Sequence, residues 1–149
     1  MLKFLLPVDG SDNAGKAVKK VIDMMSWYKT EPEIHLLNVQ SPLDGNVSLF
    51  INQNDIKQYH QEEGLRCLQK ARLMLDQSGV KYHYHITIGD PADRIEQFST
   101  ELHCDLIVIS ARGHGVVKTI LLGSVVNKVM QLALKPVLLI KQYGDSTYQ

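Results

Sequence analysis

Excess charge, abundant cysteine and long apolar runs are all missing from this chain of 149 residues. Its 16 basic and 16 acidic residues cancel to a formal net charge of zero, so the basic excess of a sequence-independent nucleic-acid binder is absent. No apolar run is long enough to cross a bilayer. The apolar run in the opening residues, MLKFLLPVDG, is too short for a signal peptide. We therefore expect neither nucleic acid nor a membrane as a partner.

Cysteine is scarce as well. The two cysteines, Cys67 and Cys104, lie far apart in different helical patterns and form no metal-ligand spacing. We expect both to be reduced thiols in the core of a cytoplasmic protein. The length of the chain predicts one domain with a substantial core that needs no disulfide.

Strand and helix patterns alternate along the chain. Nearly continuous apolar runs predict buried strands at 2–8, 34–39, 106–109 and 137–140, and clean alternation at 82–88 predicts a half-buried edge strand. Apolar residues spaced by three and four predict a helix after each of the first four strands. We therefore predict an α/β fold: a single doubly wound domain over residues 1–141, with a five-stranded parallel sheet and helices on both faces. Residues 142–149 are predicted to be a polar tail.

Open parallel sheets bind ligands beyond the carboxyl ends of their strands. In this chain those ends are followed by 9–11, by the stretch after Val39, by the turn after Ile88, and by 110–115. The last of these carries Gly113 and Gly115, and a Gly-Ser pair at 123–124 opens the next helical pattern. Glycines let backbone N–H groups approach an anion, and a helix N-terminus adds unpaired donors. The pattern indicates a phosphate site, although it matches neither the dinucleotide fingerprint nor the Walker loop.

The order of several short motifs is more specific. The chain contains LLPVDGSDNA, LLNV, GDPAD, DLIVISARG and LLGSVVNKV followed by KPVLLIK, with nine residues between Gly113 and Gly123. From Leu2 to Lys141 it resembles the universal stress protein family in its small single-domain form. The resemblance implies a strand order of 3-2-1-4-5 and a stress-linked regulatory protein. It further implies that the protein binds ATP, ADP or AMP, with Mg²⁺ or Mn²⁺ as candidate companion ions, and forms a homodimer through its last strand.

The resemblance also implies which residues contact the nucleotide. In the nucleotide-binding relatives the end of strand one faces adenine and ribose, the end of strand two contacts adenine, and the end of strand four and the following glycines hold ribose and phosphates. Carried over to this sequence, those positions are Pro7, Val8, Asp9, Val39, Ile109, Ser110, Arg112, Gly113, Gly123, Ser124 and Val125. Ser110 stands where these relatives have the first glycine of their motif. Its side chain could obstruct the ribose or add a hydrogen bond.

The residues themselves leave alternatives open. Ser124 is expected to cap its helix and to offer its hydroxyl to an anion. Gly113 and Gly115 could equally serve only a tight exit from the strand, with Ser124 only as a helix cap. A nucleotide-independent dimerisation or interaction module is the first alternative function, and Ser110 in place of the motif glycine is its main support. Arg112, His114 and Lys118 are the only support for a slow ATPase or phosphotransferase. No residue is predicted to be catalytic, because the chain shows neither a convincing general base nor a Walker-type carboxylate.

Two further features invite a functional interpretation. His83 and His85 project to the same side of the predicted edge strand and could bind a metal. No carboxylate or cysteine accompanies them locally, so we expect an exposed strand face instead. The segment 41–53 has no clear period and is long for a connection in a compact domain, so it is expected to be a lid or partly mobile.

Overall fold

A computed structural model of the chain describes residues 1–111 and 122–141. Strands and helices alternate along it, as the sequence predicts. The elements are β1 (Lys3–Pro7), α1 (Asp12–Met24), the 3₁₀ turn η1 (Met25–Trp27), β2 (Glu33–Gln40), α2 (Gly45–Ser48), α3 (Gln53–Ser78), β3 (Tyr82–Ile88), α4 (Pro91–Glu101), β4 (Leu106–Ala111), α5 (Ser124–Leu132) and β5 (Val137–Lys141). The predicted tail, 142–149, lies outside the described residues.

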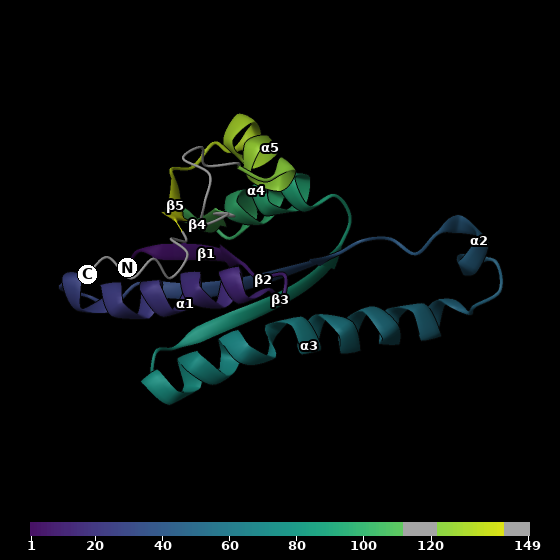
Figure 1. Ribbon diagram of the computed structural model, residues 1–149, viewed down its shortest axis with the longest axis horizontal. Helices are drawn as coiled ribbons and strands as arrows, with labels where there is room; N and C mark the ends of the chain where they lie inside the picture. Colours follow the sequence, from purple (N-terminus) through teal and green to yellow (C-terminus); the bar gives the residue numbers. More distant parts are fainter. Residues whose placement is uncertain (112–121, 142–149) are drawn as a thin grey trace, which may run out of the picture.

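The five strands form one sheet with the order β3-β2-β1-β4-β5, and every pair of neighbours is parallel. Helices α1 and α3 lie on one face of this sheet, and α4 and α5 lie on the other (Figure 1). The predicted fold class, strand order and two-sided cover are therefore confirmed. Because β1 is central and the order reverses between β1 and β4, the carboxyl ends of these two strands form the switch point at which such sheets bind ligands.

Alternation along the central strand β1 produces two separate cores. Phe4 and Leu6 pack toward α1 and α3, whereas Leu5 packs toward α4 and α5. Both kinds of position are buried, which is why β1 reads as a continuous apolar run rather than an alternating one. The sheet is thus fixed on both faces, and it holds the loops at its carboxyl edge on a rigid base.

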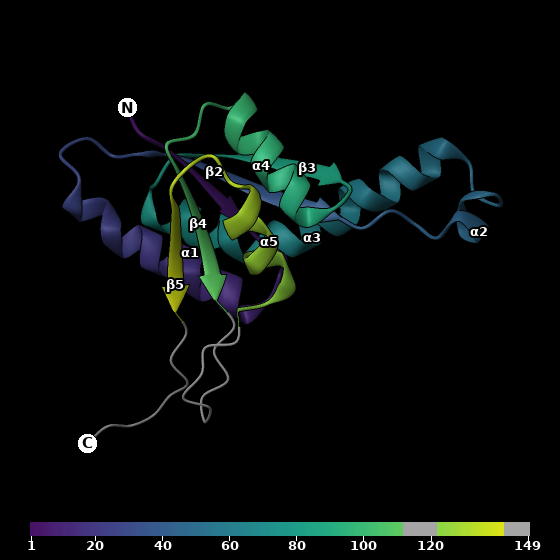
Figure 2. The ribbon, with the colours of Figure 1, turned by 90° about the horizontal axis from the view of Figure 1, so that it is seen from above.

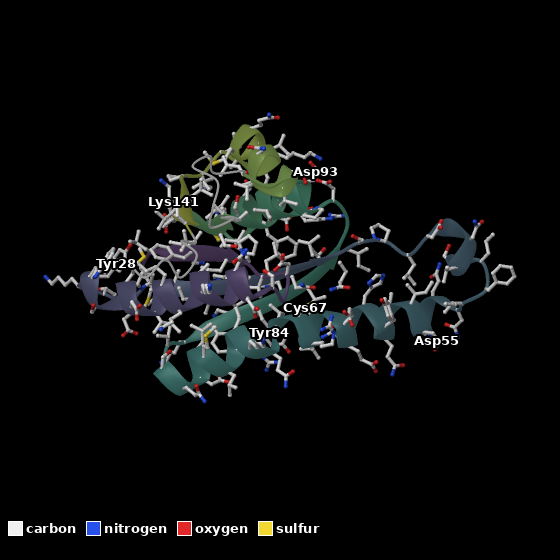
Figure 3. All side chains as sticks on the ribbon, viewed as in Figure 1. Tyr28, Asp55, Cys67, Tyr84, Asp93 and Lys141 are labelled. Atoms are coloured by element: carbon white, nitrogen blue, oxygen red, sulfur yellow. The ribbon has the colours of Figure 1, made fainter. Side chains whose placement is uncertain are left out.

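The segment 41–53 contains a short helix, α2, and leads into the first turns of α3. Figures 1 and 2 agree that α2 and the start of α3 extend beyond the sheet, and Asp55 marks this distant end in Figure 3. Leu49 and Phe50 are 80% and 88% exposed there. The segment therefore has regular structure of its own at 45–48, which its lack of a clear period did not predict.

The predicted edge strand β3 pairs only with β2 within the described sheet. The expectation of an exposed strand face holds for His83 but not for His85, because the parallel sheet brings Glu33 and His35 of β2, which are distant in sequence, beside the two histidines. His85 is half-buried and hydrogen bonds to His35, and His83 is exposed. Within 1–111 and 122–141, no group of three or more histidine, cysteine or acidic side chains is arranged to hold a metal ion.

Cys104 is buried and Cys67 is half-buried, and neither forms a disulfide. The expectation of two free thiols is confirmed, although Cys67 lies at the margin of the core. In the described part of the chain, no helix combines the length and the apolar character that crossing a bilayer requires.

Candidate functional site

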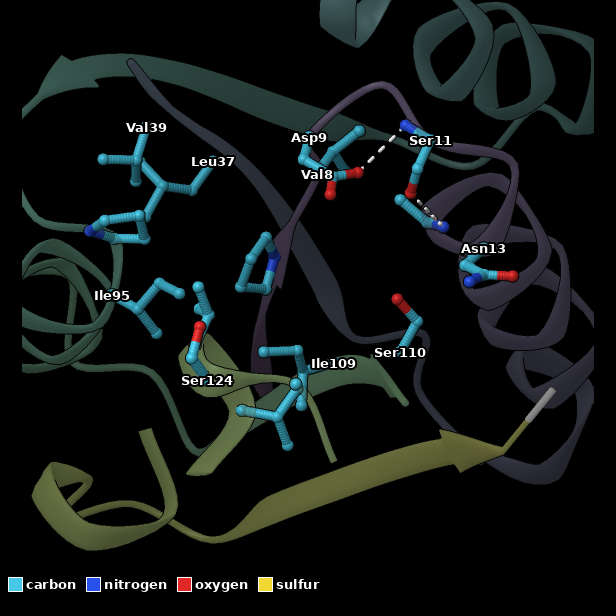
Figure 4. A pocket seen from close by; sticks show the side chains of 16 residues that line it. Val8, Asp9, Ser11, Asn13, Leu37, Val39, Ile95, Ile109, Ser110 and Ser124 are labelled. Carbon is cyan, nitrogen blue, oxygen red and sulfur yellow. Dashed lines mark hydrogen bonds between the residues drawn. The ribbon is translucent and has the colours of Figure 1, made fainter. Parts of the chain in front are cut away.

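A cavity of about 290 Å³ opens at the carboxyl ends of β1, β2 and β4. Figure 4 shows the side chains that line it. They come from the ends of these three strands and from the first turns of α1, α4 and α5. The described lining residues are Pro7, Val8, Asp9, Ser11, Asn13, Ala14, Leu37, Val39, Pro91, Ile95, Ile109, Ser110, Gly123, Ser124, Val125 and Val126.

The structure brings together all the described residues that the sequence resemblance singles out. Pro7, Val8, Asp9, Val39, Ile109, Ser110, Gly123, Ser124 and Val125 all line this one cavity. Arg112 and Gly113, which complete the predicted set, lie outside the described residues, as do His114 and Lys118. The cavity fixes where the predicted residues lie, and their contacts with a nucleotide remain a prediction.

Sequence reasoning missed several wall residues. Leu37 lies two positions before Val39 on the same strand face, so the alternation of β2 could have identified it. Pro91 belongs to the GDPAD motif and Ile95 follows one helical turn later, so the motif and the helical spacing could have identified both residues. Asn13, in the first turn of α1, carried no sequence signal. None of the lining residues comes from the segment 41–53, the predicted lid.

One side of the cavity is apolar and the other is polar. Leu37, Val39 and Ile95 gather on one side in Figure 4, whereas Ser11, Asn13 and Ser110 lie on the opposite side. The apolar side chains offer a surface for a flat, weakly polar ring, and the hydroxyls and the amide offer hydrogen bonds. Such a division suits a ligand with an apolar ring at one end and hydroxyl or anionic groups at the other.

Asp9 is held at the mouth of the cavity by a tight turn. The backbone N–H of Ser11 donates to Asp9 Oδ1 at 2.9 Å, and Gly10 between them has a φ of +85°, which a side chain would strain. A Cβ at Gly10 would also lie 3.2 Å from the Cα of Cys67 on α3. The turn therefore packs closely against α3 and sets the direction of the Asp9 carboxylate.

Three helices begin at the cavity, and their N-termini differ. Ser11 Oγ accepts from the N–H of Ala14 and caps α1, and Asp90 accepts from the N–H of Asp93 and caps α4. The N-cap residue of α5 is Gly123, whose extended backbone brings no side chain to its helix. Two of the three N-termini therefore have a capping side chain, whereas the first N–H groups of α5 have no side-chain cap among the described residues.

The prediction that Ser124 caps α5 is wrong by one position. Ser124 is the first residue of the helix and Gly123 precedes it as the N-cap. With no capping side chain, the first backbone N–H groups of α5 line the cavity without a described cap. They carry the partial positive charge of a helix N-terminus, so this end of the cavity can hold an anion.

An ion pair ties α5 to α4 beside the cavity. Lys128 Nζ lies 2.9 Å from Asp90 Oδ2 and 3.7 Å from Asp93 Oδ1. The hydrogen bond from Lys128 Nζ lowers the pKa of the Asp90 carboxyl, and the same bond raises the pKa of Lys128. All three groups are partly exposed, so the contribution to stability is small. The pair connects the N-terminal turn of α4 to α5.

Comparison with known proteins places these features in a family. The sequence model of the universal stress protein family matches residues 1–141. Universal stress protein MJ0531 of Methanocaldococcus jannaschii is 33% identical over 145 residues, which cover 94% of this chain and 82% of the relative.

Solved structures show the same fold. The structure of MJ0577, also from M. jannaschii, superposes with a TM-score of 0.76 at 29% identity and covers 96% of this chain and 97% of the other. A family protein from Arabidopsis thaliana, solved with AMP bound, has a TM-score of 0.69 at 24% identity, covers 99% of this chain and 95% of the other, and shows the shared fold. Because the family pattern spans nearly the whole chain, and because sheet order and motifs agree with it, the chain belongs to the universal stress protein family.

Proposed function

We propose that this protein is a stress-linked regulator that binds ATP, ADP or AMP in the cavity at the carboxyl ends of β1, β2 and β4. The observation that carries the proposal is that an apolar wall and the N-terminus of α5, which no side chain among the described residues caps, line the same cavity. The residues proposed to contact the nucleotide are Pro7, Val8, Asp9, Val39, Ile109, Ser110, Arg112, Gly113, Gly123, Ser124 and Val125. The family relative from Arabidopsis with bound AMP supports the class of ligand.

Each part of the ligand has a counterpart in the cavity. The adenine ring would lie against Leu37 and Val39, where burial of apolar surface favours a flat ring. When ionised, the Asp9 carboxylate can accept hydrogen bonds but cannot donate them, so it suits the ribose hydroxyls or the 6-amino group of adenine as donors. The phosphates would lie at the N–H groups of 123–125, where the helix start favours negative charge.

A divalent ion would reach this site together with the phosphates. Asp9 is the carboxylate among the described lining residues. Mg²⁺ and Mn²⁺ are commonly held by one or two carboxylates and the phosphates of the substrate. We therefore propose either ion as a companion of ATP or ADP rather than as an ion bound by protein ligands alone.

We also propose that two copies pair through β5. This strand is at an edge of the described sheet, and its residues 137–140 are apolar and half-buried. An apolar edge strand with unpaired backbone groups favours pairing with another copy. Light scattering at micromolar concentration should give the mass of a dimer, and a monomeric mass would remove this part of the proposal. Two free thiols accord with a cytoplasmic location.

Calorimetric titration with AMP, ADP and ATP, each with and without Mg²⁺, tests the main proposal. We expect saturable binding of at least one adenine nucleotide, with GMP as the control for the base. No heat and no thermal shift at millimolar ATP with magnesium would contradict nucleotide binding and favour the interaction module. Phosphate release measured in the same samples tests the ATPase alternative.

A further inference from the structure

A buried polar side chain stands on the far side of the β1–β2 pair from the cavity. Asn38 is 2% exposed and interrupts the apolar run of β2, where Ile34 and Leu36 precede it on the same face. It does not line the nucleotide cavity. It lines a cleft of about 420 Å³ between the end of β2 and α3, and Asp9 and Val39 form the wall between cleft and cavity. Because burial of an amide costs free energy unless it is hydrogen-bonded, we expect Asn38 to have hydrogen-bond partners within the protein.

The first of these partners is the backbone carbonyl of Val8. The backbone pairing of β1 with β2 ends where the N–H of Val8 donates to Leu37 at 2.8 Å. Beyond this point β1 turns away, and Asn38 Nδ2 donates to the Val8 carbonyl at 2.8 Å. Val8 is itself buried. Without the amide, the carbonyl of this buried residue would lose the side-chain partner that satisfies it.

The orientation of the amide is determined by its partners. The Val8 carbonyl can only accept, so the Asn38 atom that faces it is the amide nitrogen. Asn38 Oδ1 then accepts from Gln40 Nε2 at 2.6 Å. The backbone carbonyl of Gln40 accepts in turn from the N–H of Gly89 at 2.9 Å, next to the turn that begins α4. Asn38 thus joins the end of β1 to the ends of β2 and β3.

The Val8 carbonyl belongs to the same peptide plane as the N–H of Asp9. A bond that fixes this carbonyl therefore fixes how the chain enters the Asp9–Ser11 turn and where the Asp9 carboxylate points. We infer that Asn38 is a positioning residue of the adenine-nucleotide site, which acts through the Val8 carbonyl on Asp9 without touching the ligand. This inference rests on the proposed function, because Asp9 matters as a ligand contact only if a nucleotide binds.

Replacement of the amide by an apolar side chain of similar size gives the first test. Asn38→Leu keeps the volume and removes the donor, so the Val8–Asp9 peptide loses its anchor. We expect the Kd for AMP to rise about tenfold or more, on the order of one buried hydrogen bond. Ile34→Val, on the same strand and face but without contact to Val8, should lower stability and leave the Kd unchanged. A folded Asn38→Leu protein with the Kd of the wild type would overturn the inference.

The Asn38→Asp variant gives a second test, in which the pH dependence of the Kd distinguishes a positioning role of Asn38 from a merely structural one. An ionised carboxylate cannot donate to the Val8 carbonyl, whereas a protonated one can. The Kd of this variant, divided by that of the wild type at each pH, should therefore fall toward one as the pH is lowered through the titration of the introduced carboxyl. A ratio that does not change with pH would contradict the inference.

Hydrogen exchange separates this inference from the proposed function. The N–H of Ser11 is bonded to Asp9 in the protein without ligand, so its exchange reports on the turn alone. We expect faster exchange of the Ser11 amide in Asn38→Leu and an unchanged rate in Ile34→Val. If the wild type binds no nucleotide, the proposed function fails, and the Ser11 rates alone decide whether Asn38 positions Asp9.

Discussion

The Nδ1 atom of His35 lies 3.0 Å from the Nε2 atom of His85, and the two rings stack with an angle of 16° between their planes. His35 Nε2 lies 2.7 Å from Glu33 Oε1 on its other side. Since the carboxylate only accepts, His35 donates to Glu33 and accepts from His85. Two imidazolium rings could not share this contact, because each would present a hydrogen at the same place.

The folded protein therefore resists protonation of this pair. Burial lowers the pKa of both His35 and His85 from the usual value for histidine. The hydrogen bond to Glu33 opposes this shift at His35, whereas the neighbouring His35 adds to it at His85. Lys3 on β1 also faces the pair, and α4 contributes the ring of Phe98. The unfolded chain takes up these protons near pH 6.5, so it binds more protons than the folded chain below that pH.

The free energy of unfolding should accordingly be constant above about pH 7 and fall as the pH drops below about 6.5. Urea denaturation from about pH 8 to about pH 5 measures it. Replacing both histidines, with His35→Gln and His85→Gln, should flatten this dependence. His103→Asn is the control, since His103 is exposed and Asn tolerates its φ of 54°. An unchanged slope in the double variant would place the titration elsewhere.

Gly123 offers a test of the phosphate end of the cavity. A Cβ at this position meets no described atom within 4 Å, and the φ of −62° suits alanine. Gly123→Ala should therefore lower stability by about 1 kcal/mol or less. The added methyl group stands at the helix start that the phosphate must approach, so we expect the Kd for AMP to rise about tenfold or more.

Gly45→Ala is a matched control for this change. A Cβ at Gly45 also meets nothing within 4 Å, and Gly45 is remote from the cavity wall. Calorimetry should give the same Kd for AMP in Gly45→Ala as in the wild type. If Gly123→Ala also binds AMP with the affinity of the wild type, the phosphate does not lie at the start of α5.

Ser110 allows its methylene and its hydroxyl to be tested separately. Its side chain points into the cavity from β4 (Figure 4), at the position where the family resemblance led us to expect glycine. We expect Ser110→Gly to tighten AMP binding several-fold, because it removes a Cβ from the space proposed for the ribose. Ser110→Ala keeps that Cβ and should not tighten binding. Weaker binding in both variants would show instead that the hydroxyl holds the ligand.

The approach of α3 to β3 depends on Gly64. A Cβ there would lie 2.6 Å from Ile86 Cγ2 and 2.8 Å from its Cδ1. Alanine favours a helix over glycine by about 1 kcal/mol, but a contact this short with a stiff β-branched side chain outweighs that gain. Gly64→Ala should lower the free energy of unfolding by about 1–3 kcal/mol.

Gly15→Ala in α1 isolates the propensity effect. Its Cβ would meet only Met74 Cε, at an ordinary 3.9 Å. This variant should raise the free energy of unfolding by about 0.5–1 kcal/mol in urea denaturation. Adding Ile86→Ala to Gly64→Ala should cost less than the sum of the two single changes, because the smaller side chain makes room. Additive effects would exclude the steric explanation.

Periodicity was enough to predict the strands and their parallel sheet, and with them the strand ends at which such a sheet binds ligands. The individual wall residues, among them Asp9, Val39 and Ser110, were predicted from the family resemblance. Partners that depend on register were not, since His35 meets His85 and Asn38 meets Val8 across strands that lie tens of residues apart in sequence. The cap of α5 was missed by one residue, because serine is a frequent N-cap and glycine gives no comparable signal.

The cavity wall runs from Pro7 to Val126 and draws on six elements and their loops. No part of the chain shorter than this span could form it. A ligand held there would bind only when β1, β2 and β4 are assembled with their helices, and it would stabilise the folded protein against unfolding as its free concentration exceeds the Kd. Under the proposed function, the fraction of this protein that is open to proteases at any moment would therefore fall as the adenine-nucleotide concentration of its surroundings rises.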